Sequence, residues 1–497
     1  MTADLRDAIF DVSACRTEIG ARTGRSARTV LVVAAIKIAT ALGTTAVLAR
    51  LVPPAEQGLV ALAIPAVLLA ASISEFGLAQ ALVQRPHITH RLASTLFWIN
   101  VALGILCGFA IALLGWPAAR LYEKPEIVSI FLGLTPYVLF TVLGTQYVAI
   151  LRRQLRVGVI ELCSLGSALL ASAAAVVAAC AGAGYWVFVL QLVLAEAFNM
   201  VFLVSSVRWW PSPPWRTDIS GARDALRFGG YLAAEGLIGE LVHNMQFFVI
   251  GRVFSSVETG LFFRAQTMAQ MPGRRISAPL AGAFVPALSR LQDDKNLFCE
   301  MYHRQVTRGN LIMIPIGVLV ISCSDVIVHV LLGDNWLDAI PLLSWLGLLP
   351  LMALNIRSFA WAMVACGRGR ELFLFRLATA PILIMAIVGG AQMGIVELVA
   401  VYVVALTIVQ CAILAVVVVR TTPLTVGSLA RSVLRDCVVA GLVLALTWGL
   451  RTWLVCSPAL IEGLAAAGFV AICYITLVLL DPALRSDAIK ALGFWRR

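Results

Sequence analysis

Long apolar runs alternate with short polar segments along the whole chain. Several runs contain Gly or Pro, which helix bundles tolerate when neighbouring groups satisfy the freed backbone atoms. A helix needs about 20 apolar residues to cross a bilayer, so the pattern predicts an all-α integral membrane protein with about 14 transmembrane helices. The predicted spans are 30–49, 58–78, 94–115, 127–150, 160–181, 184–206, 228–250, 262–287, 310–332, 339–364, 371–390, 395–419, 436–455 and 459–480.

The composition agrees with this prediction. Of the 497 residues, 60% are hydrophobic and only 13% are charged, whereas an average soluble protein has about 25% charged residues. These values exclude a soluble globular protein, a disordered chain and a disulfide-rich secreted module. The 11 cysteines lie mostly within apolar runs. They form no C-x-x-C pair, so we interpret them as small core residues rather than disulfides or metal ligands.

The basic residues are distributed unevenly between the loops. The chain has 38 Lys and Arg against 27 Asp and Glu, a net charge of +11, which is typical either of nucleic-acid binding or of membrane topology. Loops on the side of the N-terminus carry 27 basic residues, the opposite loops carry five, and six lie within predicted spans. Because short cytoplasmic loops are enriched in Lys and Arg, we expect both termini in the cytoplasm and no nucleic-acid partner.

A repeated motif divides the chain into two similar halves. The pattern R-x5-E-x-G-L starts at Arg50, after the first predicted span, and again at Arg252, after the seventh. Six spans separate the copies, so the halves have the same orientation, as in transporters built from parallel repeats with the substrate path between them. Each copy also suits a tight turn, with a glycine that permits it and charges that complement helix dipoles. A purely structural role is therefore the main alternative.

The spans, the repeat and the loops together predict five segments. They are a cytoplasmic N-terminal segment, an N-lobe of six helices, an inter-lobe linker, a C-lobe of six helices, and two further helices with a cytoplasmic tail. The linker is rich in proline and contains three tryptophans, which we expect to anchor at the membrane interface. The five segments comprise residues 1–29, 30–206, 207–227, 228–420 and 421–497.

No sequence feature points to catalysis. The loops are too short for an extramembrane catalytic domain, and the chain has no Walker A, H-E-x-x-H or G-x-S-x-G motif. His87 and His90 lie in a predicted loop without further ligands, so we expect no metal site. We also expect no cofactor and no catalytic residue.

Six stretches carry a family resemblance, in a fixed order along residues 28–480. They are 49–62, 75–78, 184–186, 250–252, 284–292 and 332–336. They resemble Wzx-type polysaccharide flippases, in particular the colanic-acid-exporter-like branch of the MOP (multidrug/oligosaccharidyl-lipid/polysaccharide) exporter superfamily. Many of these relatives have an acidic residue just before the Ile-Gly-Arg stretch, where this chain has Gln246. A cation-binding role at that position is therefore not carried over.

The resemblance implies an architecture, a substrate and a location. The architecture is two parallel-repeat six-helix lobes plus two C-terminal helices. The substrate is an undecaprenyl-diphosphate-linked oligosaccharide, moved across the bacterial inner membrane by alternating access during exopolysaccharide or lipopolysaccharide biosynthesis. Membrane lipids, and a polysaccharide polymerase with export machinery, are the further partners that this function suggests.

Basic residues within the predicted spans are candidates for the substrate site. A charge at mid-bilayer costs about 2.5–3.5 kcal/mol on insertion scales, so each needs a partner, a route to the interface or a wet cavity. A diphosphate calls for cations, and the planar guanidinium of Arg matches phosphate geometry. Arg264 and Arg275 are eleven residues apart, about three helical turns, and so share one stripe of the eighth span. The predicted cationic site comprises Lys37, Arg264, Arg275, Arg357 and Arg376; local pairing with acidic neighbours is the alternative.

Acidic residues of the seventh span are candidates for ion coupling. Glu240, His243 and Asn244 lie at i, i+3 and i+4 on one helix face, and Glu235 lies on a neighbouring stripe. A buried Glu beside a His could titrate near neutral pH, so we predict coupling through Glu235, Glu240 and His243. The alternative is that these glutamates pair with Lys37 and the arginines. Elsewhere, Asp325 and His329 are also four apart, and we expect them to form a surface pair.

Two other functions fit the helix pattern less well. A multidrug or lipid II exporter of the same superfamily would share the architecture, but a drug-cation exporter should have a net acidic cavity, and basic residues predominate within these spans. A membrane polysaccharide polymerase should need a large outer loop or a catalytic acidic motif, and neither occurs.

Overall fold

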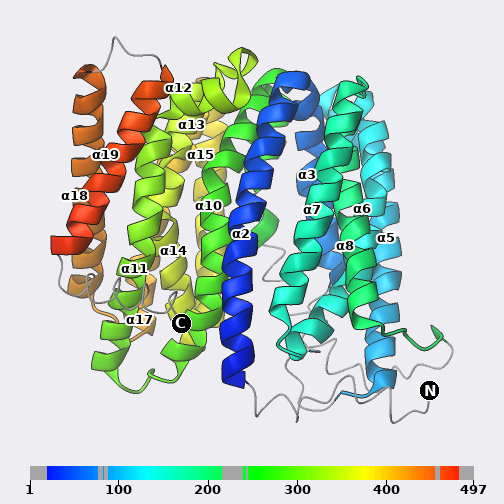
Figure 1. Cartoon of the computed structure of the whole chain (residues 1–497), viewed down its shortest axis with the longest axis horizontal. Coiled ribbons are helices and arrows are strands. Elements are labelled where there is room, and N and C mark those ends of the chain that lie inside the picture. Colours follow the sequence, from blue (N-terminus) through cyan, green and yellow to red (C-terminus); the bar gives the residue numbers. More distant parts are fainter. Residues whose placement is uncertain are drawn as a thin grey trace. The chain divides into compact units, whose positions relative to one another are not determined.

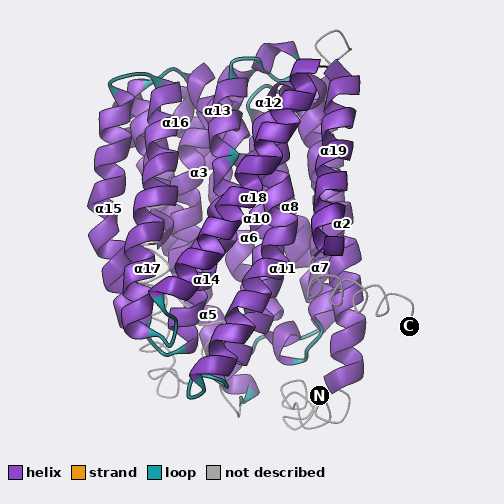
Figure 2. Ribbon diagram, turned by 90° about the vertical axis from the view of Figure 1, so that its left-hand side faces the viewer, coloured by secondary structure: helices purple, strands orange, loops and turns teal. Residues whose placement is uncertain are grey.

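The computed structural model describes residues 19–75, 82, 88–214, 239–241, 244–453 and 459–480. Every regular element within these residues is a helix, and they contain no strand (Figure 2). Eleven of the described helices are long and apolar enough to cross a membrane. This confirms the all-α, multi-pass membrane protein. The number of fourteen spans stays a prediction, because the span expected at 228–250 lies mostly outside the described residues.

The chain divides into two compact units, Met1–Gly260 and Leu261–Arg497. The long described helices of the first unit are α2 (Ile19–Leu51), α3 (Pro54–Glu75), α5 (His90–Tyr122), α6 (Glu126–Arg153), α7 (Val157–Cys180) and α8 (Trp186–Val207), shown in Figure 1. Here α6 packs against α3, α5 and α8, and α7 packs against α2 and α8. The predicted lobe limits stay predictions.

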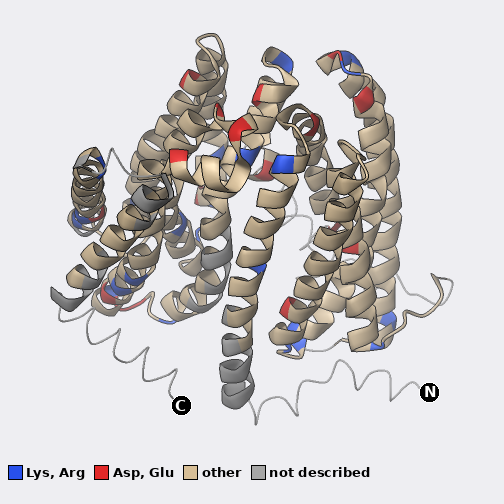
Figure 3. Ribbon diagram, turned by 45° about the horizontal axis from the view of Figure 1, so that its top comes forward, with Lys and Arg blue, Asp and Glu red and all other residues tan. Residues whose placement is uncertain are grey.

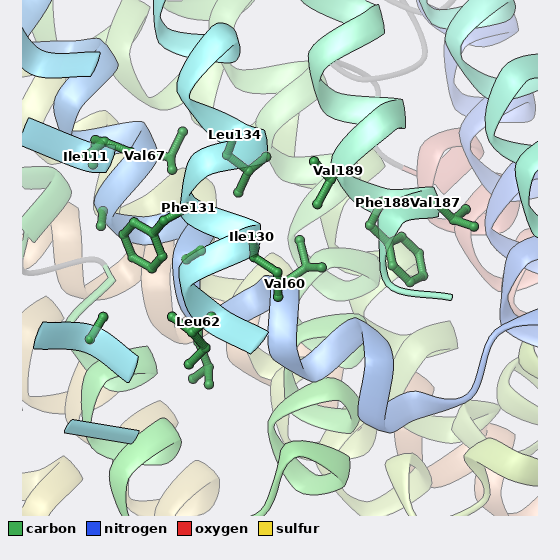
Figure 4. Packing of buried hydrophobic residues seen from close by; sticks show 14 of the residues in the cluster. Val60, Leu62, Val67, Ile111, Ile130, Phe131, Leu134, Val187, Phe188 and Val189 are labelled. Atoms are coloured by element: carbon green, nitrogen blue, oxygen red, sulfur yellow. The ribbon is translucent and has the colours of Figure 1, made fainter. Parts of the chain in front are cut away.

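The first unit has an apolar core and an apolar outer surface. Phe131 and Leu134 of α6 are almost fully buried and lie in one cluster with Val60 of α3 (Figure 4). On the outside, Leu106 and Phe109 of α5 are each 63% exposed. Charged residues lie mainly toward the helix ends, and the middle stretches of the helices are almost uncharged (Figure 3). Large apolar surfaces without charge are rare on soluble proteins and are what lipid-facing helices require.

The second unit contains helices that are more often interrupted. Its elements are α10 (Ser256–Ser289, which begins in the first unit), α11 (Lys295–Ser322), α12 (Ser324–Ile327), α13 (Ala339–Leu346), α14 (Leu348–Ala365), α15 (Gly369–Ala391), α16 (Ile395–Val404), α17 (Gln410–Thr421), α18 (Val426–Trp453) and α19 (Ala459–Leu480). Short π-helical turns at Val328–Leu332 and Ala405–Val409 interrupt two of the predicted spans. Helix α11 packs against α14, α18 and α19, so the C-terminal pair of helices belongs to the core of this unit.

The start of the predicted linker is bound to the first unit. Trp209 is only 1% exposed, and its indole N–H donates to Nδ1 of His90 at 3.0 Å. His90 Nε2 lies 2.8 Å from the hydroxyl of Ser212, whose carbonyl accepts from the Trp98 indole at 2.7 Å. The expected interfacial role is therefore wrong for Trp209, which is a core residue, whereas Trp210 is 72% exposed.

Candidate functional site

The two copies of the repeated motif pack against each other through their glycines. Gly58 lies in the first turns of α3, and Gly260 lies at the equivalent position of α10. A Cβ atom on Gly58 would lie 1.8 Å from the carbonyl oxygen of Ser256, and one on Gly260 would lie 2.0 Å from that of Pro54. Pro54 and Ser256 occupy equivalent positions of the motif, so the contact is symmetric. Only glycine permits this approach of two backbones.

The acidic residues of the motif differ between the copies. Glu258 accepts hydrogen bonds from the backbone N–H and the hydroxyl of Ser255 at 2.9 and 2.8 Å. The Ser255 hydroxyl in turn accepts from the N–H of Glu258 at 3.2 Å, which completes a capping box at the start of α10. Glu56 of the first copy has no serine before it and lies beside Gly184 instead. The structural interpretation of the turn therefore holds for the second copy.

Lys37 is paired within the first unit. Its side chain is 5% exposed, and its Nζ lies 2.7 Å from Oε2 of Glu161 on α7. An opposite charge at this distance offsets much of the cost of burying the ammonium group. Lys37 thus pairs with a carboxylate, as the alternative to a cationic site expects. Its partner, Glu161, was not among the residues that the sequence singled out.

Arg264 is buried in the second unit against an aromatic ring. It is 6% exposed, and its guanidinium carbon lies 5.6 Å from the ring centre of Trp336, within the range of a cation–π interaction. Trp336 is fully buried at the end of a 3₁₀ turn that follows Gly333, whose φ of 88° favours glycine. The stretch 332–336, one of those that carry the family resemblance, therefore supplies the aromatic ring that contacts Arg264.

The other predicted cations lie on three helices of the second unit. Arg357 of α14 donates from Nη1 to the carbonyl oxygen of Gly273 in α10 at 3.0 Å. Arg264 thus belongs to α10, and Arg357 contacts it. Arg376 lies on α15, which packs beside α14. The side chain of Arg275 lies outside the described residues, although its backbone continues α10.

The predicted coupling residues are only partly described. Glu235 and His243 lie outside the described residues. Oε1 of Glu240 accepts from Nδ2 of Asn244 at 2.8 Å, which agrees with their predicted common face. Gln246 is fully buried, and neither of its amide atoms has a hydrogen-bond partner among the described residues.

One polar network of the second unit was missed from the sequence. Nδ2 of Asn310 on α11 donates to Oδ2 of Asp436 on α18 at 2.5 Å and to Oδ1 of Asn355 on α14 at 3.4 Å. All three side chains are at most 3% exposed. Asp436 lies at the first position of a predicted span, where a charge looks interfacial, and only the packing of three helices shows that it is buried.

The end of α18 is held by a second polar contact. Nη2 of Arg451 lies 2.5 Å from Oδ2 of Asp325, and the Arg451 guanidinium also donates to the carbonyl of Ser322. His329 pairs with Asp334 instead, at 3.0 Å. The predicted pair of Asp325 with His329 is therefore wrong, because a cation from another helix is better placed to reach the carboxylate.

Comparison with known proteins identifies the family. The sequence profile of a family described as "Polysaccharide biosynthesis protein" matches residues 47–341, more than half of the chain. The chain belongs to this family. The resemblance seen in the sequence is thereby confirmed.

Relatives and solved structures agree with this assignment. The lipopolysaccharide biosynthesis protein WzxC of Escherichia coli is 25% identical over 70% of this chain and 71% of its own length. The succinoglycan biosynthesis transport protein ExoT of Rhizobium meliloti is 23% identical over 71% of each chain. The lipid II flippase MurJ, in an inward closed conformation, superposes with a TM-score of 0.64 at 12% identity and covers 90% of this chain and 100% of its own. An inward-facing MATE transporter of the MOP superfamily gives a TM-score of 0.53 at 13% identity, with 82% and 94% covered. The chain shares its fold with these two proteins.

Proposed function

We propose that the protein is a flippase that moves undecaprenyl-diphosphate-linked oligosaccharide repeat units across the bacterial inner membrane by alternating access. The family match over residues 47–341 carries this proposal. It is supported by relatives named for polysaccharide biosynthesis and for transport, and by a fold shared with a lipid II flippase. A multidrug or lipid II exporter is less favoured, because this chain shares only the fold with such transporters.

The proposed orientation places both termini in the cytoplasm of a bacterial cell. The support is the distribution of basic residues, with 27 in loops on the side of the N-terminus and five in the opposite loops. In this orientation the turns that precede α3 and α10 are external.

The glycine contact is the proposed closure at the outer ends of α3 and α10. A transporter that works by alternating access must close one end of its path while the other is open. Contact between Gly58 and the backbone at Ser256 leaves no space between these helix ends.

The basic residues are proposed to neutralise the diphosphate during its passage. Lys37, Arg264, Arg275, Arg357 and Arg376 supply positive charge within helices that otherwise carry little of it. Arg264 and Gly273, the backbone contact of Arg357, are nine residues apart on α10, or about 13 Å along the helix axis. Cations that contact α10 at two levels suit successive positions of a moving phosphate better than one fixed site.

Ion coupling is proposed for the seventh span. Glu240 presents a carboxylate next to Asn244, and Glu235 and His243 lie on the same predicted helix. Coupling to an ion gradient would supply the energy that a chain without a Walker A motif must obtain elsewhere.

Mass spectrometry of undecaprenyl-linked lipids in a deletion strain tests the function. We expect lipid-linked repeat units to accumulate and polymer export to stop, with both effects reversed by the wild-type gene. No accumulation in the deletion strain would contradict the flippase proposal.

Variants of the gene test the role of the arginines. The double variant Arg264→Gln with Arg357→Gln should not complement the deletion. The control Arg290→Gln, which changes an exposed arginine just beyond α10, should complement it fully. Normal export by the double variant, correctly inserted, would exclude these arginines from the substrate path.

A further inference from the structure

Helices α11 and α18 pack against each other and run in the same direction, and we call the line of contact between them the α11–α18 seam. Polar contacts fix their register: Asn310 bonds to Asp436 and Thr307 bonds to Arg435, pairs separated by 126 and 128 residues. Residues one or two turns earlier on each helix must therefore also face each other. On α11 the face continues through His303, and on α18 it continues through Ser432.

Basic and hydrogen-bonding groups gather at the end of this seam that the proposed topology places in the cytoplasm. Arg431 and Arg435 of α18 are both exposed and both interact electrostatically with His303. Nη2 of Arg435 bridges the seam to Oγ1 of Thr307 at 2.8 Å. Arg304 and Arg308 follow His303 and Thr307 in the sequence of α11. The acidic groups nearby are Glu300, at the solvent end of α11, and Asp436, which Arg435 already neutralises at 3.1 Å.

Two buried groups at the same place lack a partner. Nε2 of His303 and the hydroxyl of Ser432 are both inaccessible and have no hydrogen-bond partner among the described residues. Ser432 is 9% exposed and lies one turn before Asp436, on the face that meets α11. Leaving a buried donor unsatisfied costs about 1–3 kcal/mol, so a ligand that accepts hydrogen bonds is favoured there. If Arg431 only extended toward water at the membrane interface, it would not need the unpaired His303 Nε2 and Ser432 hydroxyl beside it.

We propose that this end of the α11–α18 seam binds the phosphate of an anionic lipid. Phosphate oxygens accept hydrogen bonds and match guanidinium geometry, and basic pockets between transmembrane helices on the cytoplasmic side suit lipid headgroups. The depth also fits. The apolar stretch of α18 begins at Leu429, so Arg431 and Ser432 lie within its first turn, at the level of the headgroups. Arg435 lies one turn deeper and is the one that carries an acidic partner.

Lipid binding by the purified full-length protein tests the site. Native mass spectrometry in detergent would measure the affinity for phosphatidylglycerol, with phosphatidylcholine as the uncharged comparison. Arg431→Gln should weaken phosphatidylglycerol binding about fivefold, the effect of one basic residue near anionic lipid. Ser432→Ala should also weaken it. Arg420→Gln removes an exposed arginine at the end of another helix, α17, and should leave binding unchanged.

Two sources of the phosphate are distinguished by competition. If undecaprenyl diphosphate displaces phosphatidylglycerol and its binding also weakens in Arg431→Gln, the site takes the carrier lipid. If its binding is insensitive to that change, the site takes bilayer phospholipid. Equal phosphatidylglycerol affinity in wild type and Arg431→Gln, or an equal loss in Arg420→Gln, would overturn the proposal, provided that the lipid-free melting temperatures agree. The readout does not involve transport, so it succeeds or fails independently of the proposed flippase activity.

Discussion

Replacing Gly58 by alanine should open the contact between the two motif copies. The added Cβ would lie 1.8 Å from the carbonyl oxygen of Ser256, whereas carbon and oxygen normally approach no closer than about 3.3 Å. The backbones must therefore separate by roughly 1.5 Å, since the obstructing atom belongs to the main chain and cannot rotate away. Overpacking of this kind costs about 1–3 kcal/mol. The closed form should lose between about fivefold and two-hundredfold in population relative to the open form.

Spin labels on the outer turns would measure this shift. Leu51, the last residue of α2, and Val257 of α10 are 46% and 44% exposed. Labels on cysteines placed there in a cysteine-free background report the separation of α10 from the turn that leads into α3. Gly58→Ala should move the distance distribution to longer values and reduce polymer export. Gly43→Ala is the matched control, because a Cβ on Gly43 of α2 meets no atom within 4 Å; it should leave both readouts unchanged.

Because the contact is symmetric, both glycines should respond to substitution in the same way. Gly260→Ala should give the same shift as Gly58→Ala, because its Cβ would meet the Pro54 carbonyl at 2.0 Å. The double variant should cost less than the sum of the single variants, since both relieve the same contact by the same separation. An unchanged distance distribution in Gly58→Ala, with normal export, would refute the assignment of this contact as a closure.

The helices could be predicted because their signal is local. A run of about 20 apolar residues specifies a span whatever surrounds it, and the last predicted span coincides with α19 at residues 459–480. The interruptions could not be predicted. The π-helical turn at Ala405–Val409 lies within a continuous apolar run, and nothing in apolarity distinguishes one helical hydrogen-bond register from another.

The sequence names candidate residues for the site but not the groups that they contact. Spacing correctly identified the repeat, because matching letters require no knowledge of the fold. It did not show that Gly58 and Gly260 meet, because contacts between segments some 200 residues apart depend on tertiary packing. The same holds for Lys37, whose partner Glu161 lies on a helix that is distant in sequence. Burial makes a charge expensive, but only packing decides which opposite charge is near.

Three further predictions concern the charged and aromatic contacts. Lys37→Met should lower the unfolding free energy, by less than the ~3–5 kcal/mol of a fully buried pair because Glu161 is 30% exposed; adding Glu161→Gln should restore part of the loss in thermal unfolding of the purified protein. Trp336→Ala should cost about 3–5 kcal/mol by the same measurement, whereas Trp336→Phe, which keeps a ring beneath Arg264, should cost clearly less. The contact of Asp325 with Arg451 should depend on pH. Burial alone would raise the pKa of Asp325, but hydrogen bonds from Arg451 and from backbone N–H groups outweigh it and hold the pKa below its ordinary value. A carboxyl group whose pKa is depressed on folding stabilises the folded state above its unfolded pKa of about 3.9, and this stabilisation disappears as the pH falls through the folded value. Arg451→Gln should therefore lower the melting temperature at pH 7 and reduce the further drop between pH 5 and pH 3. An undiminished drop in the variant would show that Asp325 is not the group responsible.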